Sequence, residues 1–358
     1  MNKLKYGIIG AGYISDKHLE GYAALDEKVS LEAICDIVED RAVQKAEKYG
    51  IKDVYTDYGK LLARKDIDFV SICLPNHLHE AASVKAMESG KHVHCEKPMA
   101  LNAKQAANML EVSRRTGKKL MVGVNNRFTP QSQFIKNYIK SGNLGEIYYA
   151  RCGWVRRAGL SYAGWFCNKE LAGGGPLIDL GVHFIDLAMY YMDYPAVNSV
   201  TARTYSKFGM NDDLRQLYTF EGAKADFDIR YSVEDFTAGF VNLGNDACLN
   251  FEISWASNIE SEKRFYEILG DKGGIKFEDM SETPALKIFT REHGQFVDIE
   301  PKIKTDGYNT TEFSHFIDSI LNNQPPYMSL PEQSVEVMRL IDAAYESAEK
   351  SGRQIILS

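Results

Sequence analysis

Asp179 and His183 stand four residues apart in a segment that begins with three glycines and Pro176. Proline suits the first position of a helix, and residues at this spacing share one helix face. A histidine near a helix N-terminus stays neutral because the positive end of the helix dipole disfavours imidazolium. Such a ring can accept a hydroxyl proton while hydride leaves the same carbon, with Asp179 orienting the ring or binding a neighbouring hydroxyl. An isolated pair of this kind is more often a helix salt bridge, so other motifs must support a catalytic interpretation.

Gly10 and Gly12 join a predicted strand at 4–9 to a predicted helix at 13–25. Gly10 permits a tight turn, Gly12 lets the backbone approach a pyrophosphate, and the helix N-terminus offers N–H donors to the phosphates. Ser15 replaces the third glycine of the dinucleotide-binding fingerprint, a departure expected to loosen the contact between helix and strand. The alternative is a glycine turn needed only for packing. The predicted strand before the turn and the predicted helix after it disfavour this alternative.

Asp36 follows the second predicted strand, at 29–35. An acid at this place accepts hydrogen bonds from the adenosine ribose hydroxyls and repels a 2′-phosphate. Arginine does not directly adjoin Asp36, although Arg41 lies in the following helix. We therefore expect NAD as the cofactor, with NADP less favoured.

Lys97 lies in the run Glu96-Lys97-Pro98, directly after a predicted strand at 91–95. Open α/β sheets bind ligands at the carboxyl ends of their strands. A lysine at this edge could reach both the nicotinamide ribose and a substrate hydroxyl, and its charge would stabilise a developing alkoxide. Most lysines are simply solvated, but the strand-end position and the proline favour a functional one. Lys97 and the Asp–His pair together predict oxidation of an alcohol.

Five sequence motifs together resemble the glucose–fructose oxidoreductase / inositol dehydrogenase / MocA (Gfo/Idh/MocA) family, over essentially the whole chain. They are the glycine turn, Pro75-Asn76-His77 with His79, Glu96-Lys97-Pro98, Asn126-Arg127-Phe128 and the segment 173–186, GGGPLIDLGVHFID. The resemblance implies that Lys97, Asp179 and His183 are catalytic. It also implies a cis peptide bond between Lys97 and Pro98.

The resemblance further assigns contacts with cofactor and substrate. The residues expected beside the cofactor are Gly10, Gly12, Tyr13, Ile14, Asp36, Leu74, Pro75, Asn76, His79, Glu96, Lys97, Asn125 and Trp165. Those expected beside the substrate are Lys97, Arg127, Arg156, Asp179 and His183. Arg127 is a substrate candidate because it follows the last strand of the first predicted domain.

The segment 151–167 is rich in arginine and aromatic residues. Aromatic planes and guanidinium donors suit sugar rings and their hydroxyls, so Trp154, Arg156, Tyr162 and Trp165 could meet substrate or cofactor. Core packing or a subunit interface explains them nearly as well. A phenylalanine follows Trp165 where family members usually have arginine, so any role of that arginine is not carried over.

Two H-x-H pairs, His77 with His79 and His92 with His94, place side chains on one face if they lie in strands. A metal site is conceivable, but further ligands at zinc-site spacing do not follow. We therefore expect no metal and interpret these histidines as structural or cofactor-lining.

Strands and helices alternate through the first third of the chain, which predicts parallel βαβ units. Besides those above, the predicted strands are at 68–74 and 118–122, and the predicted helices at 39–49, 77–89 and 102–116. The fold class expected here is an α/β Rossmann domain at residues 1–124, which binds NAD.

The pattern changes beyond residue 124. Residues 223–232 alternate strictly, as do 249–255 after a Gly-Asn-Asp turn, which predicts antiparallel strands. Two amphipathic helices close the chain, one after Asn309 with Glu312 as its capping-box partner and one over 332–348. Residues 125–358 should thus form an α+β C-terminal domain with a mostly antiparallel open sheet, for substrate binding and oligomerisation.

Length and composition limit the class of protein. A chain of 358 residues is typical of two domains, and its net charge of −7 disfavours nucleic-acid binding. Neither a membrane-spanning apolar run nor a signal peptide precedes or interrupts the motifs. The six cysteines are scattered without a C-x-x-C pair, as expected of free thiols in a reducing cytoplasm.

The expected activity is NAD-dependent oxidation of a secondary hydroxyl on a sugar or glycoside, with C3 of a glucosyl group as one candidate. Inositol (cyclic polyol) dehydrogenase and redox-assisted NAD-dependent glycosidase are the enzymatic alternatives. A regulator that senses NAD without turnover would need the glycine turn but not the catalytic residues. The one-sided strands and the resemblance also predict a homo-oligomer, a dimer or tetramer.

Overall fold

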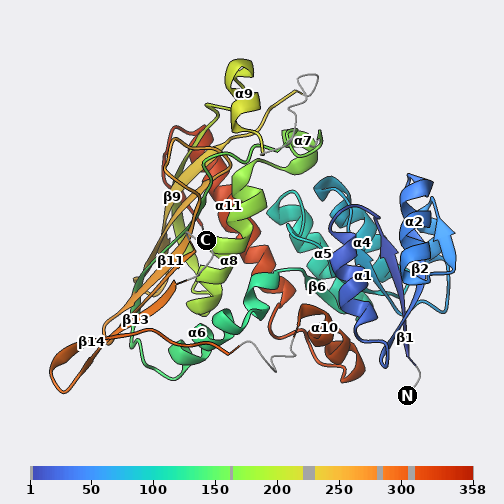
Figure 1. Ribbon diagram of the computed structural model, residues 1–358, viewed down its shortest axis with the longest axis horizontal. Helices are drawn as coiled ribbons and strands as arrows, with labels where there is room; N and C mark the ends of the chain where they lie inside the picture. Colours follow the sequence, from blue (N-terminus) through green and yellow to red (C-terminus); the bar gives the residue numbers. More distant parts are fainter. Residues whose placement is uncertain (1–2, 162–163, 221–229, 280–284, 305–310, 358) are drawn as a thin grey trace. The chain divides into compact units, whose positions relative to one another are not determined.

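The computed structural model describes residues 3–161, 164–220, 230–279, 285–304 and 311–357 (Figure 1). The chain forms two compact units. Unit 1 comprises Met1–Phe128 with Asn309–Val335, and unit 2 comprises Thr129–Tyr308 with Glu336–Ser358. The sequence placed one boundary after residue 124, whereas the structure returns a late segment of the chain to unit 1.

Unit 1 contains a parallel sheet with the strand order β3-β2-β1-β4-β5-β6. Its strands are β1 (Leu4–Ile9), β2 (Val29–Cys35), β3 (Asp53–Tyr55), β4 (Phe69–Ile72), β5 (His92–Cys95) and β6 (Leu120–Val122). The order reverses between β1 and β4, which is where open α/β sheets bind ligands. The predicted Rossmann domain is confirmed.

Helices alternate with these strands. They are α1 (Ser15–Ala23), α2 (Glu39–Tyr49), α3 (Tyr58–Leu62), α4 (His79–Glu88) and α5 (Ala103–Thr116), with short 3₁₀ turns η1 (Asn76–Leu78) and η2 (Asn125–Phe128). Asn102 caps α5 by accepting the Gln105 N–H, and Gly117 ends it at φ 68°. The sequence missed β3 and α3, because three and five residues are too few to show a period.

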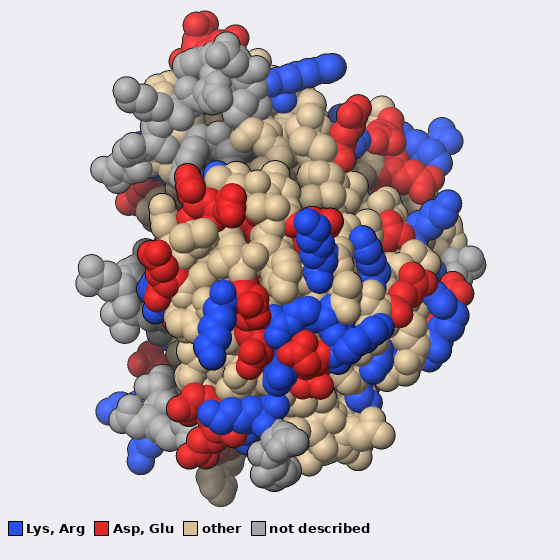
Figure 2. Space-filling view, turned by 90° about the vertical axis from the view of Figure 1, so that its right-hand side faces the viewer, with Lys and Arg blue, Asp and Glu red and all other residues tan. Residues whose placement is uncertain are grey.

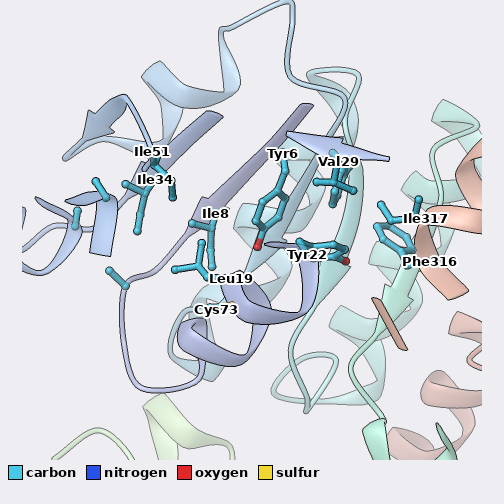
Figure 3. Packing of buried hydrophobic residues seen from close by; sticks show 14 of the residues in the cluster. Tyr6, Ile8, Leu19, Tyr22, Val29, Ile34, Ile51, Cys73, Phe316 and Ile317 are labelled. Carbon is cyan, nitrogen blue, oxygen red and sulfur yellow. The ribbon is translucent and has the colours of Figure 1, made fainter. Parts of the chain in front are cut away.

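The late helix α10 (Glu312–Leu321) completes the core of unit 1. Its Phe316 and Ile317 belong to the same buried cluster as Tyr6 and Tyr22 (Figure 3). Apolar packing therefore explains why this segment joins unit 1 although it is distant in sequence.

The cap of α10 differs from the prediction. Thr311 accepts the Ser314 N–H and Ser314 accepts the Thr311 N–H, so these two hydroxyls form the capping box. Glu312 is instead the first helical residue and is buried. Asn309, the predicted cap, lies outside the described residues.

Unit 2 is built on a mostly antiparallel sheet, as predicted, in the order β14-β13-β12-β11-β7-β10-β9-β8-β15. Its strands are β7 (Ile147–Val155), β8 (Val197–Tyr205), β9 (Phe236–Leu243), β10 (Cys248–Ser254), β11 (Lys263–Gly270), β12 (Gly274–Asp279), β13 (Ala285–Glu292), β14 (Gln295–Ile299) and β15 (Ile355–Ile356). The pair β7–β10 is parallel. The antiparallel partner of β10 across the Gly-Asn-Asp turn is β9. Most of the predicted strand at 223–232 lies outside the described residues.

The helices of unit 2 range from four residues in α7 to nineteen in α11. They are α6 (Pro130–Lys140), α7 (Lys169–Ala172), the π-helical turn η3 (Leu177–Gly181), α8 (Val182–Tyr191), α9 (Asp212–Tyr218) and α11 (Pro331–Glu349), whose first residues belong to unit 1. The turn η3 contacts β7 and β10, which ties the segment carrying the predicted Asp–His pair to the sheet.

Positive and negative side chains intermix on the face that Figure 2 shows. Such a surface differs from the one-signed basic face typical of nucleic-acid binders. Among the described residues, helices long and apolar enough to cross a membrane are absent.

Candidate active site

The glycine turn has the geometry that a dinucleotide requires. Gly10 adopts φ 101°, and a Cβ there would overlap the carbonyl oxygen of Cys73. A Cβ at Gly12 would meet no described atom within 4 Å, so the space above its backbone is open to a ligand. The turn thus fits the approach of a pyrophosphate to the start of α1.

Lys45 of α2 braces this turn, a contact that the sequence did not reveal. Its Nζ donates to the Gly12 carbonyl at 2.8 Å and to the Ser15 Oγ at 2.7 Å, and it pairs with Asp16 at 2.7 Å. The Ser15 hydroxyl donates to the same Gly12 carbonyl at 2.6 Å. Ser15 therefore tightens the turn through hydrogen bonds, and the predicted looser contact between helix and strand stays a prediction.

Asp36 links the end of β2 to the glycine turn. Its Oδ2 accepts the Ala11 N–H at 2.7 Å, and its Oδ1 accepts the Val38 N–H at 2.8 Å. Each carboxylate oxygen retains capacity for a further hydrogen bond. The side chain is partly exposed, as a contact with ribose hydroxyls needs.

His79 ties together the loops that follow β4 and β5. Its ring nitrogens lie 2.7 Å from the carbonyl oxygen of Pro98 and 2.8 Å from that of Leu74. Burial lowers the pKa of His79, and the two carbonyls oppose that shift. The Lys97–Pro98 peptide bond is cis, as the resemblance predicted. Lys97 itself is partly exposed at this edge of the sheet.

Glu96 is buried behind Lys97. Its Oε1 lies 2.8 Å from Nε2 of His18, whose Nδ1 lies 2.8 Å from the Ser71 hydroxyl. Its Oε2 accepts the backbone N–H of Lys97 at 3.1 Å. Burial alone would raise the pKa of Glu96, but His18 and the Lys97 charge hold it well below its usual range. Glu96 thus holds the backbone of Lys97 from its buried side. The predicted contact of Glu96 with the cofactor stays a prediction.

Asn125 and Arg127 follow β6 in η2. The Oδ1 of Asn125 is buried without a hydrogen-bond partner among the described residues, which suits an acceptor for a cofactor amide. Arg127 is fully buried, and its guanidinium donates to the Met328 carbonyl at 2.9 Å and to Gln333 at 2.5 Å. These contacts make Arg127 part of the packing of unit 1, and its predicted contact with substrate stays a prediction.

In unit 2, Asp179 lies in η3 and His183 in the first turn of α8. π-helical turns within α-helices occur frequently at functional sites. The Trp255 indole donates to the Asp179 Oδ2 at 3.0 Å, and the Trp154 ring lies 6.4 Å from the His183 ring. Tryptophan side chains from two strand ends therefore flank the predicted pair.

Arg156 completes this group. Its guanidinium stacks 4.6 Å from the Trp154 ring centre and lies 3.6 Å from the Glu262 carboxylate. Burial lowers the pKa of Arg156, while the negative charges of Asp179 and Glu262 oppose that shift. A sheltered guanidinium near Asp179 can donate to sugar hydroxyls.

Among the other predicted aromatic residues, the Trp165 ring lies 4.1 Å from the neighbouring Phe166 ring, and Phe166 faces Trp255 at 6.4 Å. Tyr162 lies outside the described residues. The part of the chain that the structure describes holds no group of three or more His, Cys, Asp or Glu side chains arranged for a metal ion.

The candidate residues thus gather in two groups. Unit 1 holds the glycine turn, Asp36, the His79 loops, Lys97, Asn125 and Arg127, and unit 2 holds Arg156, Trp165, Asp179 and His183. Sequence reasoning missed Lys45, His18 and Trp255, because no local pattern marks a side chain whose partner is distant in the chain. The residues of unit 1 fit a bound dinucleotide, and those of unit 2 fit a polyhydroxylated ligand beside a histidine.

Parts of both units match known proteins. Residues 4–124 match the GFO_IDH_MocA model, described as an oxidoreductase family with an NAD-binding Rossmann fold, and residues 136–355 match its C-terminal alpha/beta domain. D-glucoside 3-dehydrogenase of Escherichia coli is 35% identical over 98% of this chain and 97% of its own. Levoglucosan dehydrogenase of Pseudarthrobacter phenanthrenivorans is 29% identical over 77% of this chain and 74% of its own. A levoglucosan dehydrogenase structure in complex with NADH and L-sorbose covers both chains fully, with a TM-score of 0.84 at 24% identity.

Proposed function

Because this chain belongs to the Gfo/Idh/MocA family of oxidoreductases, we propose that it oxidises a secondary hydroxyl of a sugar or glycoside to a ketone, with NAD as hydride acceptor. The relative that spans nearly the whole chain at 35% identity is named a D-glucoside 3-dehydrogenase, which favours C3 of a glucosyl group. The observation that carries the proposal is the Asp179–His183 segment, buttressed by Trp255 and flanked by Arg156.

Each residue has one task in the proposed reaction. His183 accepts the proton of the substrate hydroxyl, and the carbon–hydrogen bond of the same carbon breaks as the carbonyl forms. The Lys97 ammonium stabilises the developing alkoxide, and Asp179 binds a hydroxyl or orients the imidazole. The glycine turn and Asp36 would hold NAD, which when bound would accept the hydride. The balance is alcohol plus NAD⁺ giving ketone, NADH and one proton.

The test is a screen for NAD reduction with methyl glucosides, free hexoses and inositols, in which NADH and ketone are measured together. We expect equal amounts of NADH and a 3-keto product from a glucoside. NAD that stays bound and is recycled on the protein gives no net NADH in this screen. Mass spectrometry of the cofactor that copurifies detects this bound NAD.

Other outcomes of the same screen would contradict the proposal. Net NADH from inositols alone would identify a cyclic polyol dehydrogenase. Free aglycone without net NADH would identify a redox-assisted glycosidase. NAD binding with no turnover of any compound would favour a sensing regulator.

We also infer a reducing cytoplasm as the site of action, because the six cysteines are free thiols and five of them are buried. A homo-oligomer of two or four copies, paired through the sheet of unit 2, stays a prediction. Light scattering that gives the monomer mass would contradict it.

A further inference from the structure

A buried carboxylate lies against the glycine run that precedes the predicted catalytic pair. The Glu234 Oε2 accepts the Gly175 N–H at 2.9 Å, and its Oε1 accepts the Leu177 N–H at 3.2 Å. The Tyr345 hydroxyl of α11 donates to the same Oε1 at 2.9 Å. Burial raises the pKa of Glu234, and these three donors oppose the rise.

Glu234 supplies the acceptors that the start of a helix lacks. The first N–H groups of a helix have no partner within it, and a negative charge is favourable at that end. Neither Pro176, which directly precedes η3, nor Gly181, which precedes α8, makes a side-chain capping bond. The side chain of Glu234, remote in sequence, therefore acts as the cap.

The glycines are required by this arrangement. A Cβ at Gly174 would overlap the Tyr345 hydroxyl, and a Cβ at Gly175 would overlap the Glu234 carbonyl oxygen. The backbone of the run therefore lies directly against the Tyr345 side chain and the Glu234 backbone, which leaves η3 little freedom to shift along its axis.

A second connection runs from the same place to the other side of Asp179. Asp235, the neighbour of Glu234, accepts the Trp255 backbone N–H on its carbonyl oxygen at 3.0 Å. The Trp255 indole then donates to the Asp179 carboxylate at 3.0 Å. Glu234 and Asp235 thus hold both the backbone that carries Asp179 and the side chain that orients it.

We propose that Glu234, with Tyr345, is a positioning residue that sets the register of η3 and α8 and so places Asp179 and His183 for proton and hydride transfer. The inference rests on the proposed function, since it assigns those two residues to catalysis. Reacting groups must be held close to the productive geometry, and a displacement of about 1 Å can cost about 100-fold in rate. Glu234 itself touches neither substrate nor cofactor in this scheme.

Glu234→Gln tests the proposal with nearly unchanged shape. An amide keeps one acceptor oxygen and presents an NH₂ group to a backbone N–H, so one of the two backbone bonds is lost. We expect the single-turnover rate of hydride transfer to fall about 10- to 100-fold, by the same dependence on geometry. The primary deuterium isotope effect should increase, while NADH affinity stays unchanged because every residue expected beside the cofactor, except Trp165, lies in unit 1. Tyr345→Phe should act in the same direction with a smaller effect.

Glu346→Gln is the matched control, since Glu346 follows Tyr345 in α11 but is exposed and pairs only with Lys350 among the contacts described. It should leave every readout unchanged. Wild-type rates and isotope effects in both Glu234→Gln and Tyr345→Phe would overturn the proposal. Equal losses of NADH affinity and turnover would also overturn it, because they indicate a general structural defect. If Glu234→Gln fails to fold, Tyr345→Phe decides by the same criteria.

Amide hydrogen exchange separates this inference from the proposed function. Exchange at residues 174–181 should accelerate in Glu234→Gln, whatever the substrate. Unchanged exchange there would overturn the positioning role. Accelerated exchange, in a protein whose wild type oxidises no sugar, would instead reject the proposed function and retain Glu234 as the cap of η3.

Discussion

The indole N–H of Trp255 donates a hydrogen bond of 3.0 Å to the Oδ2 of Asp179. Trp255 directly follows β10 and is only 1% exposed, so the sheet fixes its ring. Because a buried indole needs an acceptor and a carboxylate needs donors, each residue restricts the other to one orientation. An aspartate held in this way presents its other oxygen in a defined direction.

Trp255→Phe removes this donor while keeping an aromatic ring. A hydrogen bond to a charged group contributes about 1.5–3 kcal/mol, so we expect kcat/KM for a glucoside to fall about 10- to 100-fold. NADH affinity should not change. Steady-state kinetics and NADH fluorescence titration measure the two effects, and an unaltered kcat/KM would show that the bond does not orient Asp179.

His183→Ala removes the proposed base, and general base catalysis contributes about 10²–10⁴-fold to the rate. Lys97→Ala should cause a loss of similar size, because a charge that stabilises the alkoxide disappears. The exposed Lys104 of α5 provides the control, as Lys104→Ala. Full turnover in either variant with any substrate found would refute its catalytic role.

Asp36→Ala should weaken NAD binding, because the Ala11 N–H loses its partner and the ribose loses an acceptor. We expect the KM for NAD to rise about 10-fold or more. The preference for NAD over NADP should also fall, since the repulsion of a 2′-phosphate disappears. The ratio of kcat/KM values for the two cofactors measures this, with the exposed Asp40→Ala as control; a preference that does not move would contradict the assignment.

Lys45→Met breaks the hydrogen bonds that brace Gly12 and Ser15. We expect the dissociation constant of NADH to increase about 10-fold, because the turn that binds the cofactor loses its conformation. The kcat should be largely retained, because the turn takes no part in proton transfer. Lys48→Met is the comparison, since its Nζ lies 3.6 Å from Asp16 and 3.7 Å from Glu20 at an exposed site. Equal NADH affinities in both variants would show that Lys45 is dispensable.

Glu312→Gln should alter how stability depends on pH. Burial, with the nearby Glu96 charge, raises the pKa of Glu312 to about 8, while Lys17 opposes the rise. Between the pKa of Glu312 in the unfolded protein and its folded pKa of about 8, the folded protein therefore binds more protons than the unfolded protein. The contribution of this group to stability is complete below that value and is lost as pH rises toward 8.

The substitution removes this loss. The stability of the Gln variant relative to wild type should thus increase from pH 5 to pH 8, by up to about 1.4 kcal/mol per pH unit. Urea unfolding at both pH values measures the difference, and Glu332→Gln, at an exposed ion pair with Arg114, is the control. A difference that is the same at both pH values would mean that Glu312 is not protonated in the folded protein.

Local sequence patterns were sufficient to predict much of the secondary structure of unit 1. The strands β1 and β2 and the helix α2 begin and end where the apolar runs, helix formers and turn residues predict. The glycine turn was recognisable for the same reason, since the need for a positive φ at Gly10 is a property of that position and its neighbours. Capping was less reliable, because Thr311 and Ser314 compete with other polar residues near the start of α10.

The sequence by itself thus determined the class of fold, the cofactor turn and the residue types that could do the chemistry, because each of these depends on short runs of residues. Only the tertiary structure decided what holds them in place: Lys45 on the glycine turn, Glu96 behind Lys97, Trp255 on Asp179 and Glu234 beneath the glycine run. Most of these partners are far apart along the chain and are selected by packing and by the need of buried polar groups for hydrogen bonds. Periodicity and spacing do not encode that selection, so the positioning residues emerged only from the folded chain.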